Sequence, residues 1–471
     1  MNNFKATIGL EVHCAITATA RKLFSGGSNC FHAPNTELAL IDVGMPGSLP
    51  IFNVEAALQA IRVCFALNMK VDETVRFDRK SYFYPDLPLG YQVTQFFKPI
   101  GMEGYLNIYK SDGPCKVRIR QLHLETDAGK TMQGDHETLI DFNRSGCPLM
   151  EIVTQPDLSN ADDVILFVRM LKATVKATGA SDTEMESGNF RVDVNISISK
   201  NDELGTRVEI KNLNSYKAIR QAIEHEIKRQ TSVLTSGESV KQETRLFNEE
   251  TSSTLLMREK EDAAGYLYFP DPDLPKFVLN PELVEAQKSI PSLPDHLAAR
   301  LYNDLNMTEN LINLVEDVKL AKFTEDCLDN LSKPEQIQAL KIICGKMFAK
   351  LKDDSDIPIN PGHIQELAKL ALSDKPNEMV MKLILDEMWE TGESAAEIMK
   401  RKGLTTIKDP QTLLTHVQKV INSNPNEVAK YKDGKHSLYG FFIGQVMKET
   451  KNLANAEALN LILTEELAKL S

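Results

Sequence analysis

The sequence lacks several features that would assign it at once to a class of protein. Its 471 residues contain no run of roughly 18 apolar residues, so we expect no membrane-spanning helix. The first residues, MNNFKATIGLEVH, do not form the apolar stretch of a signal peptide, which favours a cytoplasmic location. The 7 cysteines contain no CxxC pair, which argues against a disulfide framework and a structural zinc site.

Excess positive charge and a phosphate-binding loop are also missing. The net charge is -12, so the chain is not a general nucleic-acid binder, and an RNA partner would need a local basic patch or other subunits. Gly129-Lys130-Thr131 resembles the end of a P-loop, but Leu124 stands where its first glycine belongs. With 42% hydrophobic and 25% charged residues, the composition is globular, and the length predicts two or three domains.

Alternating apolar and polar residues predict β-strands in the first half of the chain. The alternation is clear over residues 8–16, 190–199 and 207–211. It is typical of antiparallel sheets with one face on the core, and it disfavours a doubly wound parallel sheet. Helical spacing after Asn53 and after Ser215 predicts helices packed behind this sheet. The fold class is therefore α+β.

The second half of the chain is helical in pattern. Helical spacing begins after Pro294, and a short helical unit follows Asp409-Pro410. We therefore predict a sheet domain over residues 1–294, a helical domain over 295–405 and a small helical tail over 406–471.

Polar side chains gather on one face of the predicted strands. Glu11 and His13 are two residues apart, so both project from one face about 7 Å apart. Carboxylates suit Mg²⁺, and cations suit phosphate oxygens, so this set is compatible with ATP chemistry without a P-loop. The alternative is a solvated sheet face of mixed charge, which we favour for Arg207, Glu209 and Lys211 taken alone. The other polar residues of the set are His123, Glu125, Glu151, Arg191, Asp193 and Asn195.

Several longer strings resemble one family. They include IGLEVH at 8–13, FDRKSYFYPDLPLGYQVTQ at 77–95, HLETDAGK at 123–130, DFNRSGCPLMEIVTQPDL at 141–158 and GFFIGQVMKETKNLAN at 440–455. In this order along nearly the whole chain they resemble the GatB family, the B subunit of the Asp/Glu-tRNA(Asn/Gln) amidotransferase.

The resemblance implies a cradle-shaped catalytic domain with a glutamine-synthetase-like core, a helical domain and a YqeY-like tail that contacts tRNA. It implies a heterotrimer, in which the other members are an amidase subunit and a small subunit. In such an enzyme ATP phosphorylates the carboxylate of Glu-tRNA(Gln) or Asp-tRNA(Asn), and ammonia channelled from the amidase subunit then forms the amide. The sequence does not decide between the two tRNAs, and no zinc is expected.

The family's site positions carry over to residues of this chain. The magnesium positions fall on Glu11, His13 and Glu151, and Glu125 completes the predicted catalytic set. Arg79, Lys80 and Tyr82 match a family motif that lines the same cradle. From the strand pattern we add three more residues as nucleotide-binding candidates, namely Arg191, Asp193 and Lys211.

The chain also departs from the family's usual strings. Thr126 and Gly265 replace acidic residues, while Leu89 replaces a lysine and Leu267 an arginine. Thr126 would face the opposite side of a regular strand from Glu125. These changes allow a second hypothesis, a diverged paralogue that keeps the tRNA-binding and partner-binding scaffold without kinase activity. A third hypothesis, a free-standing ligase of small molecules, has no use for the string at 440–455.

Overall fold

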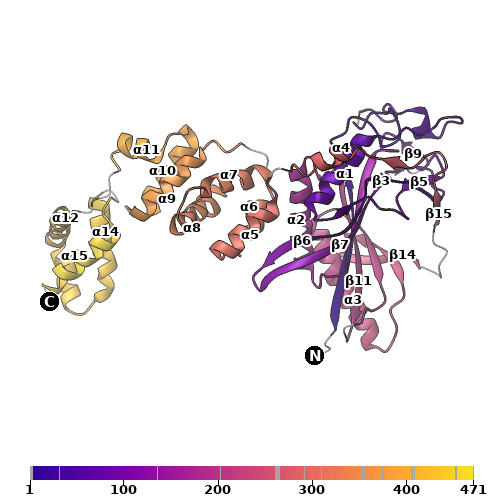
Figure 1. Ribbon diagram of the computed structural model, residues 1–471. Coiled ribbons are helices and arrows are strands. Elements are labelled where there is room, and N and C mark those ends of the chain that lie inside the picture. The colour runs from indigo at the N-terminus through magenta and orange to yellow at the C-terminus, as the bar shows by residue number, and fades with distance from the viewer. Residues whose placement is uncertain are drawn as a thin grey trace. The chain divides into compact units, whose positions relative to one another are not determined.

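The computed structural model divides the chain into two compact units, one up to Val318 and one from Lys319 on, which are described separately (Figure 1). It describes all residues except 1–3, 31, 135, 202, 260–265, 291, 309, 352–355, 374–375, 377, 405–406, 408, 451–452 and 470–471. Gly265 therefore lies outside the described residues. None of the described helices has the length and apolar content needed to cross a membrane.

A nine-stranded sheet forms the frame of the first unit. Its central strand is β1 (Lys5–Ala15), which pairs antiparallel with β10 (Pro148–Thr154) on one side and β11 (Phe190–Ser199) on the other. The full order is β14-β13-β12-β11-β1-β10-β7-β6-β2. The outer strands are β2 (Lys70–Val71), β6 (Gly101–Lys110), β7 (Gly113–Thr126), β12 (Val208–Leu213), β13 (Glu243–Asn248) and β14 (Ser253–Glu259).

The alternating pattern of the sequence explains this sheet. Ile8, Leu10 and Val12 are almost fully buried, whereas the residues between them face the other side. All neighbouring strands pair antiparallel except β12 and β13, which are parallel. The predicted α+β fold with a mainly antiparallel sheet is thus confirmed.

Three helices pack behind the sheet and cover its apolar face (Figure 1). They are α1 (Val54–Ala66), α2 (Ala161–Thr178) and α3 (Tyr216–Thr235). Each begins after a residue whose side chain accepts a backbone N–H of the first turn, and Asn53 and Ser215 are the two capping residues predicted from the sequence. The polar face of the sheet lies on the side away from these three helices.

A small three-stranded sheet belongs to the open side of the first unit. Its order is β15 (Leu267–Pro270), β4 (Asp78–Ser81) and β5 (Tyr91–Thr94), and β5 packs against β7 of the large sheet. The remaining elements are η1 (Leu40–Val43), β3 (Thr74–Val75), β8 (Lys130–Gln133), β9 (Thr138–Asp141), β16 (Phe277–Val278) and α4 (Pro281–Ala286).

Two helices beyond residue 294 also pack on this unit. They are α5 (Pro294–Leu305) and α6 (Leu311–Val315), and both contact α2. Arg169 of α2 donates to Asn313 at 2.6 Å and pairs with Glu316. The first unit therefore extends past the predicted boundary at residue 294, and the division into three domains stays a prediction.

The described elements of the second unit are helices, apart from an isolated bridge between Ile407 and Ala454, in agreement with the pattern of the sequence. In its last part, Leu413, Val417, Phe442, Val446 and Leu463 form a fully buried core. The elements of the unit are α7 (Val318–Leu328), α8 (Lys333–Ile342), the π-turn η2 (Ile343–Met347), α9 (Pro361–Ser373), α10 (Glu378–Thr391), α11 (Ala395–Lys402), α12 (Pro410–Ser423), α13 (Pro425–Lys432), η3 (His436–Leu438), α14 (Tyr439–Glu449) and α15 (Ala456–Ala468).

A buried ion pair joins Lys22, in the segment after β1, to Asp42 of η1, and Asp42 also contacts the turn that precedes β10. Lys22 is fully buried, and its Nζ lies 3.1 Å from Oδ2 of Asp42. The same carboxylate accepts the Ser25 hydroxyl at 3.1 Å, and the Asp42 carbonyl accepts the Ser145 hydroxyl at 3.0 Å. Since Ser145 lies in the turn before β10, this pair helps to position the strand that carries Glu151.

Replacing Lys22 by methionine should destabilise the first unit. The change leaves the Asp42 carboxylate buried without its cation, and breaking such a pair typically costs about 3 kcal/mol or more. Chemical denaturation of the full chain measures the loss. Lys70→Met is the matched control, because Lys70 and Glu103 form an exposed pair and their separation should leave the unfolding midpoint unchanged. Equal midpoints for both variants would contradict this role of Lys22.

Candidate active site

A cavity of about 1130 Å³ is lined by residues of both sheets of the first unit. The large sheet contributes polar side chains of β1, β7, β10, β11 and β12. The small sheet and the segments beside it contribute Lys80, Phe96, Tyr266 and Tyr268. The open face of the large sheet is therefore the floor of the cavity, and the small sheet covers part of it. This volume suits a ligand of the size of a nucleotide or larger.

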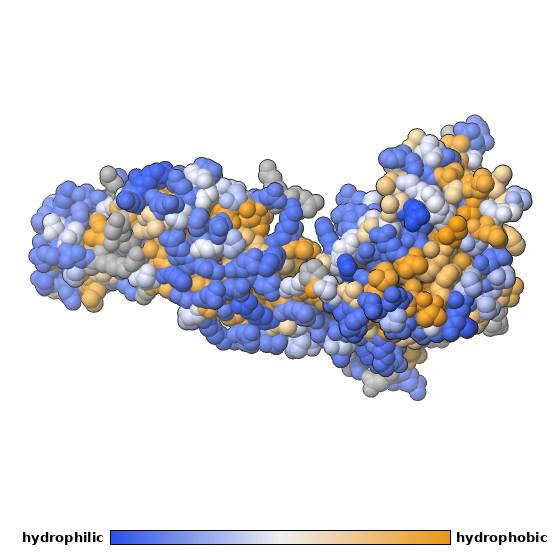
Figure 2. All heavy atoms as spheres, turned by 45° about the horizontal axis from the view of Figure 1, so that its top comes forward, coloured by the Kyte–Doolittle hydropathy of each residue, from blue (hydrophilic) through white to orange (hydrophobic). Residues whose placement is uncertain are grey.

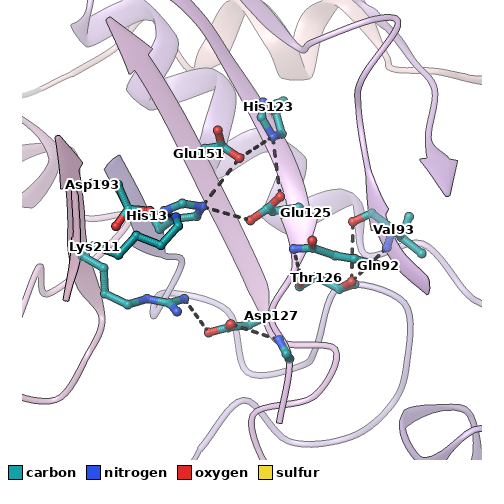
Figure 3. Close-up of polar contacts among 12 residues, drawn as sticks. His13, Gln92, Val93, His123, Glu125, Thr126, Asp127, Glu151, Asp193 and Lys211 are labelled. Atoms are coloured by element: carbon teal, nitrogen blue, oxygen red, sulfur yellow. Dashed lines mark hydrogen bonds and ion pairs between the residues drawn. The ribbon is translucent and has the colours of Figure 1, made fainter. Parts of the chain in front are cut away.

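Two histidines and two glutamates form the first cluster on this floor (Figure 3). Glu151 on β10 lies opposite His13 on β1 and opposite His123 on β7, because β10 pairs with both strands. His123 Nε2 lies 3.1 Å from Glu151 Oε2 and 3.6 Å from Glu125 Oε2. His13 Nε2 lies 3.6 Å from one oxygen of each glutamate.

The histidines and glutamates of this cluster shift one another's pKa values in favour of the charged forms. Burial opposes a charge on His123, but Glu151 and Glu125 outweigh it and raise its pKa to about 10. The pKa of His13 is raised for the same reason, again against the effect of burial. Burial alone would raise the pKa of Glu151, yet the two histidines hold it well below its usual range.

A second acidic cluster lies beside the first and includes Glu11, Asp193 and Glu209. Lys211 pairs with Asp193 at 2.5 Å and with Glu209 at 2.8 Å, and the Asn195 amide donates to Glu11 at 3.0 Å. Burial and the neighbouring Glu151 and Glu209 raise the pKa of Glu11. The pKa of Lys211 is raised because the two carboxylates outweigh its burial.

Both clusters have donor sets that fit a divalent cation. One ligand atom each of His13, Glu125 and Glu151 lie within 4.8 Å of one another, and the same holds for Glu11, Asp193 and Glu209. Oxygen-rich sets of this kind suit Mg²⁺. The expected ligands Glu11, His13 and Glu151 line one cavity, but they divide between two groups.

The strand register explains this division. Glu11 pairs with Asp193 of β11 and with the uncharged Val153 of β10, whereas His13 pairs with Glu151. Glu11 therefore gains its acidic neighbours from β11 and β12.

Lys80, Tyr82 and Arg191, three of the predicted nucleotide-binding residues, line this cavity or one that adjoins it. Lys80 lines the cavity, with its Nζ 4.9 Å from the centre of the Tyr266 ring. Tyr82 and Arg191 line an adjoining cavity of about 420 Å³, which shares His13, Glu125, Lys80 and Lys211 with the first. Arg191 donates to Asp127 at 3.0 Å.

Arg79 points elsewhere. Its guanidinium donates to Asp271 at 3.0 and 3.2 Å and to Asp273 at 2.6 Å, and it stacks on Tyr91. Successive residues of a strand face opposite sides, so Lys80 on the cavity side places Arg79 on the other. The structure thus does not bring Arg79 into the cavity, and the contacts of Arg79 join β4 to the segment after β15.

Those residues that depart from the family's strings and that the structure describes, Leu89, Thr126 and Leu267, belong to neither cluster. The Thr126 hydroxyl accepts the Val93 N–H at 3.2 Å, on the opposite side of β7 from Glu125, as strand alternation predicts (Figure 3). Leu89 and Thr126 both line a small apolar cavity of about 40 Å³. Leu267 is 66% exposed on β15.

Two members of the clusters were not assigned from the sequence. His123 shares a strand face with Glu125, but nothing in the pattern separated it from a solvated side chain. Glu209 alternates with Val208 and Ile210 as a solvated residue would, and yet it is buried. The signal that distinguishes both is burial, which depends on distant segments of the chain.

A family model described as the GatB/GatE catalytic domain matches residues 6–285, and one described as the GatB domain matches residues 322–467. The chain belongs to the GatB family. The resemblance seen in the sequence is thereby confirmed.

Members of the GatB family from several bacteria resemble this chain over almost their whole length. The relative from Persephonella marina is 41% identical over 98% of this chain and 99% of its own. The relative from Rickettsia bellii is 42% identical over 98% and 97%, and that from Caldanaerobacter subterraneus is 39% identical over 99% and 100%. Each is named as the B subunit of an aspartyl/glutamyl-tRNA(Asn/Gln) amidotransferase.

The charge cluster predicts a pH dependence of stability in the absence of divalent cations. The pKa of His123 is higher in the folded chain than in the unfolded chain, where it is about 6.5, so protonation of His123 stabilises the fold. This stabilisation is complete below about pH 6.5 and is lost as the pH rises toward 10. The pKa of Glu151 is lowered in the folded chain, so its ionised carboxylate stabilises the fold above about pH 4.3, and this stabilisation is lost on acidification. The destabilisation caused by His123→Gln should therefore be greatest between these values, at about pH 4.3 to 6.5.

Thermal unfolding in a chelator across pH 4 to 10 measures this effect, with His32→Gln as the control. His32 is exposed, and its ring lies 3.9 Å from Glu37. The His123 variant should approach the wild type as the pH rises, while the control should follow the wild type throughout. A difference for His123→Gln that stays constant from pH 5 to pH 9 would rule out the charge cluster as its cause.

Proposed function

We propose that this chain is the carboxylate-activating B subunit of a tRNA-dependent amidotransferase. In this function it transfers a phosphoryl group from ATP to the side-chain carboxylate of a mischarged aminoacyl-tRNA, and ammonia then replaces the phosphate. The observation that carries the proposal is the cavity in which two acidic clusters lie beside Lys80, Lys211 and Arg191. Membership of the GatB family supports it.

Magnesium ions fit the two acidic clusters. We place one with His13, Glu125 and Glu151 and a second with Glu11, Asp193 and Glu209, because each set offers ligand atoms within 4.8 Å. His123 would act on the first set from outside, since its contact with Glu151 orients that carboxylate. Bound Mg²⁺ supplies charge neutralisation to the phosphates.

The positively charged side chains of the cavity would bind the anionic groups of the substrates. Lys80 is largely buried, and its pKa is raised because Glu125 and its other neighbours outweigh the burial. It therefore stays charged and can bind the transferred phosphoryl group, whose oxygens gain charge during transfer. Arg191 is held by Asp127 in the adjoining cavity, where its remaining N–H groups can bind the substrate carboxylate.

The reaction explains why these groups are enclosed. A carboxylate is a poor electrophile, and its conversion to an acyl phosphate supplies a leaving group for attack by ammonia. Water would hydrolyse that intermediate. The small sheet, which covers part of the floor, would exclude water from the site. The names of the relatives include both Asp-tRNA(Asn) and Glu-tRNA(Gln), and we carry both over as substrates of this chain.

The other two members of a heterotrimer, an amidase subunit and a small subunit, belong to the same proposal. The first unit has apolar side chains at its surface, which Figure 2 shows in orange. Leu40, Leu49 and Ile51, in the segment before α1, are among the exposed apolar residues of this unit. Exposed apolar groups of this kind are typical of contact surfaces between proteins. An acidic chain also needs help to bind tRNA, which other subunits would supply.

The other two hypotheses receive less support. A scaffold without kinase activity was suggested by Thr126, Leu89 and Leu267. Thr126 and Leu89 line a separate small cavity and Leu267 is exposed on β15, while both clusters retain their ionisable groups. A free-standing ligase of small molecules has no use for the region 322–467, which matches a GatB domain of its own.

Loss of one ligand from each acidic cluster tests the proposal. We expect Glu151→Gln and Glu11→Gln to reduce ADP release on Glu-tRNA(Gln) at least about a hundredfold, because a neutral amide binds the cation weakly. The assay uses the chain coexpressed with its amidase and small partner subunits. Glutamine hydrolysis by the amidase should stay measurable in both variants.

The matched control for this experiment is Glu103→Gln, which removes an exposed carboxylate on β6. It should release ADP as fast as the wild type. The proposal fails if the wild-type complex forms well but releases no ADP above background, and also if the two cluster variants behave like the control.

A further inference from the structure

Glu209 of the second acidic cluster is held at both of its carboxylate oxygens. It lies on β12, where it pairs with Asn195 of β11 on one side and with Thr244 of β13 on the other. Its Oε1 lies 2.8 Å from Nζ of Lys211, and its Oε2 accepts the Thr244 hydroxyl at 2.9 Å. Lys211 lines the cavity, whereas Thr244 reaches the carboxylate from the neighbouring strand. The second cluster therefore has a contact with a residue that carries no charge.

Thr244 is suited to hold a carboxylate in one orientation. Its side chain is fully buried, so its hydroxyl acts on Glu209 and cannot contact a substrate in the cavity. A hydrogen bond that a carboxylate accepts is about twice as strong as one between neutral groups. Threonine is also β-branched, which restricts its rotamers and fixes the direction of the hydroxyl. Thr244 can therefore determine how the Glu209 carboxylate is turned.

Charged groups on the other face of β13 hold this strand in place. Glu243 and Arg245 flank Thr244 and face α3, as strand alternation requires. Arg245 donates to Glu243 at 3.0 Å, and Arg229 of α3 lies 3.0 Å from the same carboxylate. Arg229 also donates to the fully buried Glu226 at 2.9 Å. The strand is thus positioned by these ion pairs and by its ladder to β12, so a change of the Thr244 side chain should leave the strand in place.

We propose that Thr244 is a positioning residue of the second acidic cluster. Its hydroxyl holds the Glu209 carboxylate in the orientation in which Glu11, Asp193 and Glu209 can bind one divalent cation together. Because Thr244 is uncharged and buried, its effect on the cation is exerted through Glu209. The inference rests on the proposed function, which supplies the cation.

The charge of a bound cation explains why this contact is needed. The Lys211 ammonium group lies 2.5 Å from Asp193 and 2.8 Å from Glu209. A divalent cation among the same carboxylates would repel the ammonium group and weaken its contact with Oε1 of Glu209. The Thr244 hydroxyl is uncharged, so it would keep its bond to Oε2 and prevent the carboxylate from turning away with Lys211. Contacts of this kind around a metal ligand typically change metal affinity by about 10- to 100-fold.

Two substitutions separate the hydroxyl group from the shape of the side chain. Thr244→Val keeps the shape and removes the donor, whereas Thr244→Ser keeps the donor. We expect Thr244→Val to weaken binding of the second cation at least about tenfold, and Thr244→Ser to leave its affinity within about twofold of the wild type. Binding of Mn²⁺ to the full chain in the presence of ADP, followed by the relaxation rate of solvent water protons, measures the affinity without turnover.

The variants Glu151→Gln and Glu11→Gln assign the effect to one cluster. Glu151→Gln should retain only the second cation, so Thr244→Val should lower the Mn²⁺ affinity in this background. Glu11→Gln should retain only the first cation, and there Thr244→Val should have no effect. Thr174→Val is the matched control, because Thr174 of α2 is equally buried and its hydroxyl donates to the Met170 carbonyl at 2.8 Å. This control should keep the affinity of each background.

The outcomes distinguish this inference from the proposed function. If the wild type binds no cation that Glu11→Gln removes, the second cation of the proposed function is wrong, and the inference fails with it. If the wild type binds this cation and Thr244→Val binds it equally well, Thr244 does not position Glu209. Equal losses of affinity in Thr244→Val and Thr244→Ser, or an equal weakening of both cations, would assign the effect to packing and also overturn the inference.

Discussion

The pairing of β10 with both β1 and β7 is the constraint on which the site depends. This register places Glu151 opposite two histidines, His13 and His123, and it brings Glu125 within 3.6 Å of both. A slip of one residue in either pair would turn the site residues of the slipped strand toward the apolar core and separate them from the rest. The buried charges tolerate one another only because opposite signs are adjacent, as the opposed pKa shifts of His123 and Glu151 indicate.

The second acidic cluster follows from the same central strand. Glu11 shares the face of His13, but its neighbours come from β11 and β12, so its carboxylate lies with Asp193 and Glu209. The small sheet then covers the floor with Lys80 and aromatic rings, while Arg79 holds that sheet to the segment after β15. In the proposed function, the side chains of a mainly antiparallel sheet provide the charges that a P-loop would provide through its backbone and one lysine.

Much of this arrangement could be predicted from the sequence, and the remainder has a physical reason. Alternation over residues 8–16 and 190–199 identified the central strands, and the caps Asn53 and Ser215 located two helices. Alternation also gives the face of each residue, but it contains no information on which strands are neighbours. The division of Glu11 from His13 and Glu151 and the burial of Glu209 both depend on pairing between distant segments, so the sequence pattern could not supply them.

Counting the bound cations tests the central claim, that the floor of the cavity holds two separate ion sites. Binding of Mn²⁺ to the full chain, followed by electron paramagnetic resonance in the presence of ADP, gives the number of ions. The account predicts two per chain, one of which is lost in Glu151→Gln and the other in Glu11→Gln. A single ion that disappears in either variant would contradict two separate sites, and binding that neither substitution affects would contradict the site itself.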